Sequence, residues 1–464
     1  MKLVILGAGP AGMSLALDAL DAYGRHLDVT VLEAEEAPGG MAGGFSREGL
    51  HFDYGSHRLH KAMGADMAAW LTGMHGIELL KRPRAGRIAL GGRFVGFPLS
   101  PLDGLLHLPM GFKAGLVRDM LVIPWRRRPQ AETFERLLRH GLGDTICERF
   151  YFPYARKIWG LEPDRIAAFQ AHRRISSSQL GSLVRKTVWK LLPGGGGDFF
   201  YYPRRGFGSL AVAMQEEILR RGGRVLSSRR ATGIESGGGM RVTCSSPGGA
   251  EVHTADLVCS TIPITDLVRM LAPPPLIRAA ADSLRYRAMV LLYLVLDRDQ
   301  FTPFDAHYTP DDSILFARMS EPGNYTVAGH SKRTGLCFEI PCSFGDTIWT
   351  ASPDDLTRRI VHDLETLGLH MKDLVAAAFI RRLRHAYPLY EVDFERHLRR
   401  LTDFLDGISG VVTLGRQGLF LHDNVHHALI MGRSAAACLK PGGGWEDGSW
   451  KMHVAAFQKQ VVED

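Results

Sequence analysis

The sequence contains little cysteine and lacks the arrangements in which cysteine usually binds metal. Six cysteines are scattered over 464 residues, without a C-x-x-C pair and without histidines at zinc-site spacing. This argues against a zinc site of the usual kind, and we expect no bound metal. Thiols without a disulfide framework are typical of a reducing compartment, so the sequence predicts a cytoplasmic protein.

Long apolar runs and basic tails are also missing. No stretch of about 18 uninterrupted apolar residues occurs, so we expect no integral membrane segment. Residues 102–124 are apolar and end near a run of arginines, which favours two packed helices, with a membrane-surface helix as the alternative. The net charge of +7 comes without a basic low-complexity tail, so no nucleic-acid partner is expected. Most of this charge is solvated surface, but it is compatible with an anionic small-molecule substrate such as a phosphate.

Catalytic groups made of side chains alone are not evident either. The sequence shows no Ser–His–Asp triad, no paired-carboxylate site and no metal cluster, so a bound cofactor is expected to carry the chemistry. The chain is longer than one ordinary hydrophobic core, which predicts two domains.

What is present begins in the first dozen residues. An apolar run over residues 1–6 predicts a buried strand, and a G-x-G-x-x-G turn follows before an apolar-periodic helix. In such a turn Gly7 allows the tight bend, Gly9 lets the backbone approach a pyrophosphate, and Gly12 lets helix and strand pack closely. The helix N-terminus then offers unpaired N–H groups to the phosphates. The pattern predicts a dinucleotide site, the alternative being a glycine-rich turn without a ligand.

A carboxylate and a second glycine pair follow this turn. Residues 29–32 are typical of a second strand, and Glu33 closes it at the position where a carboxylate accepts from ribose hydroxyls. Gly39 and Gly40 come a few residues later. This spacing resembles the FAD-containing superfamily of amine oxidases, protoporphyrinogen oxidases and UDP-galactopyranose mutases. The resemblance implies FAD rather than NAD, with the second glycine loop running along the cofactor.

Further motifs resemble the branch of this superfamily that contains UDP-galactopyranose mutase. Residues 55–60, Gly-Ser-His-Arg-Leu-His, fit the G-x-H-x-x-H motif that the mutases place near the flavin. The resemblance implies that Gly55 binds the cofactor and that His57 or His60 lies beside the flavin, where an imidazole can tune its potential. The alternative for each histidine is a structural role, as a buried side chain whose hydrogen bonds are made within the protein.

Two arginines and a tryptophan are implied at the substrate by the same resemblance. Residues 154–163 match the mutase pattern Y-x-x-K-x-W-G-x-x-P, which makes Trp159 a wall for the substrate or, alternatively, a helix-packing anchor. Arg173 lies at the spacing of a substrate-site arginine, a role that its neighbour Arg174 could also take. Arg318 corresponds to an arginine over the flavin, the alternative being an ion pair with Glu321.

The C-terminal part carries the remaining motifs. Tyr387 precedes a proline as the diphosphate-contacting tyrosine of the mutases does, and Arg416 lies in a G-R-x-G motif that contacts cofactor and substrate. Gly432 falls in a helix expected over residues 427–439 that returns to the cofactor. His422 replaces a diphosphate-binding tyrosine, and an aspartate of the mutases is Asn424 here. These departures leave the UDP-sugar substrate in doubt.

The pattern of the chain predicts an α/β fold in which a Rossmann-like FAD-binding domain carries an inserted α+β substrate domain. We expect the FAD-binding domain at 1–70, 200–265 and 406–464, and the substrate domain, with a helical part, at 71–199 and 266–405. Helices are expected over 62–80 and 131–188, a hairpin turn at 91–92, and strands at 224–226, 239–245, 250–253, 255–261, 288–297, 313–319, 334–341, 378–384 and 410–416.

The predicted function is that of an FAD-dependent oxidoreductase. It would oxidise a C–OH or C–N bond of a polar metabolite, sugar-like or phosphate-bearing, by hydride transfer to flavin N5, with a pocket base taking the proton. The alternative is a mutase-like, net non-redox enzyme acting on a sugar nucleotide through reduced FAD. A flavin-binding protein without turnover is the third reading.

Overall fold

The computed structural model describes residues 1–97, 108–126, 133–174, 199–326, 332–371, 373–440 and 444–462. Its first layer is a five-stranded sheet in which every neighbouring pair runs parallel. The strand order is β10-β2-β1-β14-β20, with β1 Lys2–Leu6, β2 Asp28–Leu32, β10 Arg224–Leu226, β14 Leu257–Ser260 and β20 Val411–Thr413. The sheet therefore brings together segments that lie about 400 residues apart in the chain.

The central strand of this sheet is buried on both faces. Leu3 and Ile5 pack into one hydrophobic core, while Val4 and Leu6 pack into another, as the two-residue period of a strand requires. Three long helices cover the first face: α1 Pro10–Tyr23, α11 Gly208–Arg220 and α18 Val425–Ala437. The second face is covered by α12 Ile264–Met270, α16 Phe394–Asp406 and the antiparallel sheet β11 Arg230–Ser236, β12 Met240–Ser246 and β13 Gly249–Ala255.

The second layer is a seven-stranded sheet with the order β19-β15-β18-β17-β16-β7-β8, antiparallel except between β16 and β7. Val290, Leu292 and Leu294 of β15 face the helix α15, and Leu291 and Tyr293 face an aromatic cluster around Phe52. The strands are β7 Gly86–Leu90, β8 Arg93–Phe97, β15 Tyr286–Leu296, β16 Ala306–Tyr308, β17 Arg318–Ser320, β18 Thr334–Cys342 and β19 Val375–Pro388, and α15 spans Pro353–Thr366.

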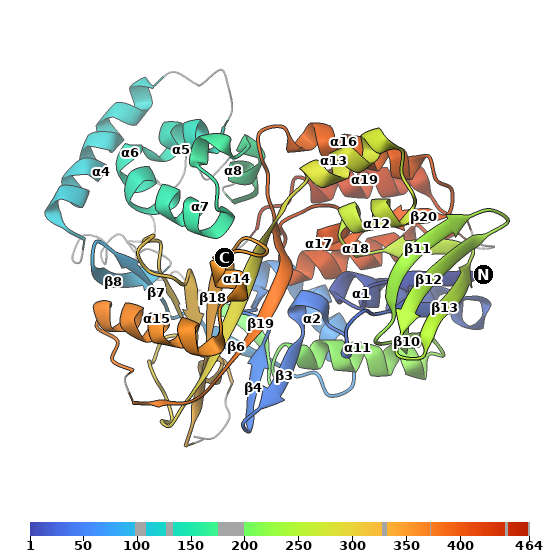
Figure 1. The fold of residues 1–464 in the computed structure, drawn as a ribbon, viewed down its shortest axis with the longest axis horizontal. Coiled ribbons are helices and arrows are strands. Elements are labelled where there is room, and N and C mark those ends of the chain that lie inside the picture. Colours follow the sequence, from blue (N-terminus) through green and yellow to red (C-terminus); the bar gives the residue numbers. More distant parts are fainter. Residues whose placement is uncertain are drawn as a thin grey trace.

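A group of helices stands at one end of this sheet, at the upper left of Figure 1. It contains α4 Met110–Val122, α5 Phe134–Leu142, α6 Asp144–Ile146, a π-helical segment Cys147–Tyr151, α7 Phe152–Trp159 and α8 Ala168–Arg174. The other helices are α2 Gly64–Thr72, α13 Pro275–Ser283, α14 Thr347–Thr350, α17 Gly415–Gly418 and α19 Asp447–Phe457. Two small sheets complete the fold: β3 Gly44–Arg47 with β4 Leu50–Asp53, and β5 Leu59–His60, β9 Phe199–Pro203 and β6 Leu79–Pro83.

The α/β fold expected from the sequence is confirmed, as is the hairpin at Gly91 and Gly92, which both have positive φ. Three local expectations were wrong. The helix expected over 62–80 ends at Thr72, because the chain turns there and forms strand β6 from Leu79. The strand expected at 313–319 is confined to β17. In the segment before β17, the backbone N–H of Leu315 donates to the Asp363 carboxylate rather than to a neighbouring strand. The helical stretch 131–188 breaks into several short helices up to Arg174; residues 131–132, 175–188 and 102–107 lie outside the described residues.

Within the described part of the chain, no helix combines the length and the apolar character needed to cross a membrane.

Candidate functional site

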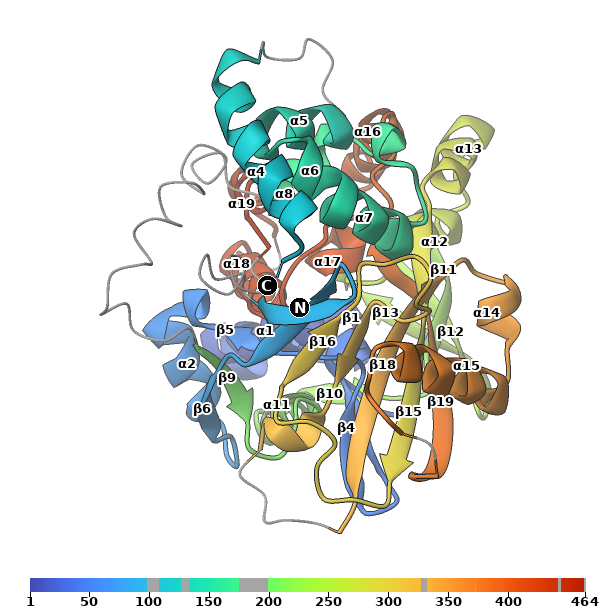
Figure 2. The same ribbon diagram turned by 90° about the vertical axis from the view of Figure 1, so that its left-hand side faces the viewer.

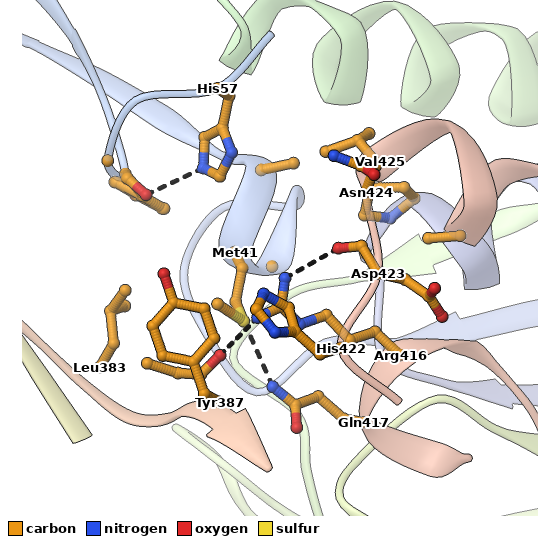
Figure 3. Close-up of a pocket in the computed structure, with 18 of the residues that line it drawn as sticks. Met41, His57, Leu383, Tyr387, Arg416, Gln417, His422, Asp423, Asn424 and Val425 are labelled. Atoms are coloured by element: carbon orange, nitrogen blue, oxygen red, sulfur yellow. Dashed lines mark hydrogen bonds between the residues drawn. The ribbon is translucent and has the colours of Figure 1, made fainter. Parts of the chain in front are cut away.

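A cavity of about 360 Å³ lies between the two large sheets. Its walls come from the turn after β1, the second glycine loop, the segment 54–60, strands β17, β18 and β19, and the segments 415–417 and 422–425. It therefore begins at the carboxyl ends of the parallel strands, the edge at which ligands bind in such sheets. Figure 3 shows part of this cavity from within.

At one end of the cavity two glycines face each other. Gly9 precedes helix α1, has an ordinary φ of −78°, and an added Cβ would meet only the Cα of Gly40, at 4.0 Å. The fold itself would thus accept a side chain at position 9, which means that the open space above it is available to a ligand. Helix α1 has no side-chain cap and no acidic residue in its first turn, so its N–H groups and positive dipole end remain for an anion.

Glu33 stands beside this turn and lines the same end. It follows strand β2, is buried, and accepts hydrogen bonds from the backbone N–H groups of Ala8, at 2.8 Å, and Glu35, at 2.9 Å. Burial raises the pKa of the Glu33 carboxyl, against the effect of these backbone donors. A carboxylate fixed in this way is positioned to accept from vicinal hydroxyls of a nucleotide.

The other predicted glycines are divided between the cavity and the core. Gly7, Gly40 and Gly55 line the cavity, and Gly7 and Gly55 share a φ of 98°. Gly12 and Gly432 do not: a Cβ on Gly12 would lie 2.1 Å from the carbonyl oxygen of Gly7, and one on Gly432 2.1 Å from that of Ala11. These two residues are glycines because helix α1 packs closely against β1 and α18. Gly39, with a φ of 124°, shapes the second loop behind the cavity wall.

His57 lines the same cavity. Its Nε2 is 2.9 Å from the carbonyl oxygen of Tyr54, and burial lowers the pKa of the imidazole below its ordinary value (Figure 3). A carbonyl only accepts, so the neutral ring carries its proton on Nε2, and Nδ1 is left as a proton acceptor. His60 also lines the cavity, and its Nδ1 accepts from the backbone N–H of Ala62 at 3.1 Å.

Arg318 reaches the cavity from β17 and forms a bidentate ion pair with Glu339 of β18, with contacts of 2.6 to 2.9 Å. The alternative pair with Glu321 does not occur, since that carboxylate accepts from the backbone of Phe301 and Thr302 instead. Glu339 also accepts from the backbone N–H of Ser56 at 2.8 Å. The pair thus anchors the histidine motif to the second sheet.

Tyr387, His422 and Arg416 meet on one wall of the cavity, as Figure 3 shows. The Tyr387 and His422 ring centroids are 4.7 Å apart, and the Arg416 guanidinium carbon lies 5.3 Å from the Tyr387 ring centroid. Arg416 donates to the carbonyl oxygens of Asp423, at 3.0 Å, and Ala386, at 2.7 Å. These bonds fix the arginine on the wall.

Two residues expected at the substrate do not line the cavity. Arg173 is 1% exposed; it donates to the carbonyl oxygens of His422 and Phe457, both at 2.7 Å, and pairs with the buried carboxylate of Asp423. It therefore holds the wall segment from behind rather than touching a ligand. Trp159 is buried with its ring edge-on to Phe134, 5.4 Å between centroids, which is the helix-packing alternative.

The sequence reasoning missed several residues of the cavity wall: Arg58, Arg84, Tyr308, Glu339 and Asp423. Glu339 did carry a signal, because it is the one carboxylate in the otherwise uncharged strand β18, where it needs a buried partner. Arg58 lies inside the histidine motif and is 3.5 Å from Asp305. The remaining residues come from segments whose proximity only the fold creates.

Outside the cavity, one group of potential metal ligands occurs among the described residues. Donor atoms of Cys244, Glu251 and His253 lie within 4.8 Å of one another on strands β12 and β13. Arg229 occupies the Glu251 carboxylate with contacts of 3.2 and 3.4 Å, which places a positive charge beside the group.

The parallel sheet, the uncapped helix after a glycine turn and the buried ribose-type carboxylate define the class of nucleotide-cofactor oxidoreductases. The chain belongs to the family of flavin containing amine oxidoreductases, whose profile matches residues 10–438. It is an enzyme, and its cofactor is FAD. Gly7, Gly9, Glu33 and Gly40 are the residues that fit the nucleotide part, because together they leave a cradle that a Cβ at position 9 would enter.

Known proteins resemble the chain at low identity. The chloroplastic protoporphyrinogen oxidase 1 of Spinacia oleracea is 24% identical over 307 residues, which cover 61% of this chain and 53% of that protein. The match thus spans about half the length of the relative. A structure of reduced UDP-galactopyranose mutase superposes with a TM-score of 0.77 at 20% identity, covering 94% of this chain and 93% of that one. An Exiguobacterium sp. 255-15 protein provisionally named a protoporphyrinogen oxidase gives 0.73 at 19% identity, covering 94% and 98%.

Putrescine oxidase with bound putrescine also shares the fold, with a TM-score of 0.66 at 15% identity over 94% of this chain and 98% of that one.

Proposed function

We propose that the protein oxidises a C–OH or C–N bond of a polar, anionic metabolite of sugar-like or phosphate-bearing chemistry. Bound FAD supplies the hydride acceptor. The observation that carries the proposal is a single cavity that is lined both by Gly9 and Glu33 and by His57 and Arg416. A substrate above the flavin would therefore meet a neutral base and cationic side chains together.

His57 is the residue to which we assign the proton. Burial keeps the imidazole neutral, and its Nε2–H donates to the Tyr54 carbonyl oxygen, so Nδ1 is the atom that would take the O–H or N–H proton of the substrate. His60 is the second candidate, but its Nδ1 already accepts from Ala62.

Binding of an anionic substrate is assigned to the cationic wall. Arg58, Arg84 and Arg416 line the cavity, together with the Tyr387 and His422 side chains. Arg318 also lines it, paired with Glu339, and Arg58 lies 3.5 Å from Asp305. Arg416 donates to the carbonyl oxygens of Asp423 and Ala386, and a planar guanidinium on the cavity wall suits a phosphate or carboxylate.

Anaerobic titration of the holoenzyme tests this proposal. A panel of sugar phosphates and amino-sugar phosphates should contain compounds that bleach the oxidised flavin absorbance, whereas the dication putrescine should not, because the wall is cationic. His57→Gln should slow the bleaching about 10²- to 10⁴-fold while FAD content is unchanged. Bleaching by putrescine but by no member of the anionic panel would refute the substrate class, and an unchanged rate in His57→Gln would remove the proposed base.

A mutase-like reaction is the second candidate, and the grouping of Tyr387, Arg416 and His422 on one wall supports it, since these side chains suit a diphosphate. That reading requires UDP to bind tightly. It also requires conversion of a UDP-sugar to an isomer after dithionite reduction, without net consumption of electrons. Weak UDP binding, followed by flavin absorbance, would favour the oxidoreductase.

A further inference from the structure

Helix α4 has an apolar surface on the side that faces away from the protein. Its inward side, including Phe112 and Asp119, is buried, and Gly115 lies so close to α6 that an added Cβ would be 2.5 Å from the Thr145 hydroxyl. The side chains on the outward side are large and apolar as well. They are Met110 (76% exposed), Val117 (58%), Leu121 (70%) and Trp125 (87%), with Met120 and Val122 beside them.

These residues follow the helical period. Positions 110, 114, 117 and 121 fall on one stripe of α4, and Trp125 continues it into the turn after the helix. A solvent-facing stripe of a globular protein is normally polar, because nothing inside the fold gains from burying it. Since packing against α6 is satisfied by the opposite side, the fold does not explain the outward stripe. We call these outward residues, 110, 117, 121 and 125, the α4 stripe.

The charged side chains in the segment 110–126 are mostly cationic. Lys113 and Arg118 flank the stripe on either side at helical spacing, and the Arg118 side chain is 64% exposed. The single acidic residue of the segment 110–126 is Asp119, which is buried, accepts from the backbone N–H of Thr145 and pairs with Arg118 at 2.9 Å. The sequence continues with three consecutive arginines at 126–128, of which Arg126 pairs with Asp144.

We propose that the α4 stripe docks the protein on the surface of an anionic lipid bilayer. An apolar stripe between cations, with an exposed tryptophan at its end, matches the interface, where rings and aliphatic side chains enter the headgroup region and cations meet lipid phosphates. In Figure 1, α4 lies at the outer left edge of the group of helices, the side that faces the viewer in Figure 2. The attachment is peripheral, by one helix face, and does not depend on the proposed reaction.

Co-sedimentation of the FAD-loaded protein with vesicles tests this surface. Vesicles that contain phosphatidylglycerol should bind the protein at low salt, and pure phosphatidylcholine vesicles or high salt should weaken binding. The double variant Leu121→Ser, Trp125→Ser should lower the bound-to-free ratio at least about tenfold. The control Leu276→Ser, Met452→Ser, which removes equally exposed apolar side chains elsewhere (61% and 71% exposed), should bind like the parent.

Both variants change exposed side chains, so their melting temperatures should equal that of the parent, which separates lipid binding from folding. Failure of the parent to sediment with anionic vesicles would overturn the proposal, as would equal losses in both double variants. Light scattering would also overturn the proposal if the parent is a dimer in solution and the Leu121→Ser, Trp125→Ser variant is a monomer. The α4 stripe would then bind a second copy of the chain.

Discussion

Two glycines of one turn, Gly9 and Gly12, are required for different physical reasons. A Cβ at position 12 would collide with the Gly7 carbonyl oxygen at 2.1 Å, whereas one at position 9 would meet little protein. Gly12 therefore serves the packing of helix α1, and Gly9 serves the ligand. The sequence motif assigns the same two roles to Gly9 and Gly12, and the contacts of an added Cβ give the physical reason for the difference.

His307 is a residue whose burial links stability to pH. It is 2% exposed, and burial, together with the charge of Arg87, lowers the pKa of its imidazole to about 4. The unfolded chain binds this proton below about pH 6.5, and the folded one only near pH 4, so folding loses stability as the pH falls through that window. At about pH 5 this loss amounts to about 2 kcal/mol.

Replacing the imidazole by an amide should remove this effect. His307→Gln should flatten the decline of the unfolding free energy between about pH 7 and pH 5, measured by urea denaturation, even if it lowers stability at neutral pH. A decline as steep as that of the parent would show that His307 is not the buried neutral group described above.

At the scale of elements, Arg173 joins helix α8 to two distant segments. Its guanidinium reaches the carbonyl oxygens of His422 and Phe457 and the carboxylate of Asp423, and both charged side chains are at most 1% exposed. Removing one member of a buried pair leaves the other charge without compensation, which costs about 3–5 kcal/mol.

Arg173→Met should therefore lower the unfolding free energy by about 3–5 kcal/mol. Adding Asp423→Leu should recover part of that loss, because no buried charge is then left alone; the double-mutant cycle measures the coupling. The folded variant should still retain most of its FAD. A variant Arg173→Met of parental stability but with no turnover would instead return this arginine to the substrate site, where the sequence resemblance placed it.

The elements that could be predicted from the sequence are those with local signals. The turn at residues 7–12, the hairpin at 91–92 and the buried strand at 288–297 follow from glycine spacing and apolar runs. The strand β6 was missed because it forms through pairing with the distant strand β9. The strand expected at 313–319 is shorter, as β17, because its extent is set by pairing with β16 and β18. Likewise the roles of Arg173 and Glu339 depend on partners that a linear sequence does not bring together.

At the scale of the molecule, the cavity is a consequence of the two sheets meeting. The parallel sheet contributes the glycine turn and Glu33, and the seven-stranded sheet contributes Arg318, Glu339 and Tyr387. The division into an FAD-binding and a substrate domain at the boundaries given above stays a prediction. Residues of both layers thus face one cavity.

The most direct test of the account is the FAD content of Gly9→Val. The parent protein should be yellow and should release FAD, not FMN, on denaturation. In Gly9→Val, the added side chain enters the space that the fold leaves open, so the protein should fold with a far-ultraviolet spectrum like the parent's but retain almost no FAD. The control Gly233→Val, at a site where an added Cβ meets no atom within 4 Å, should retain it fully. Stoichiometric FAD in folded Gly9→Val would contradict the assignment of the cavity to the cofactor.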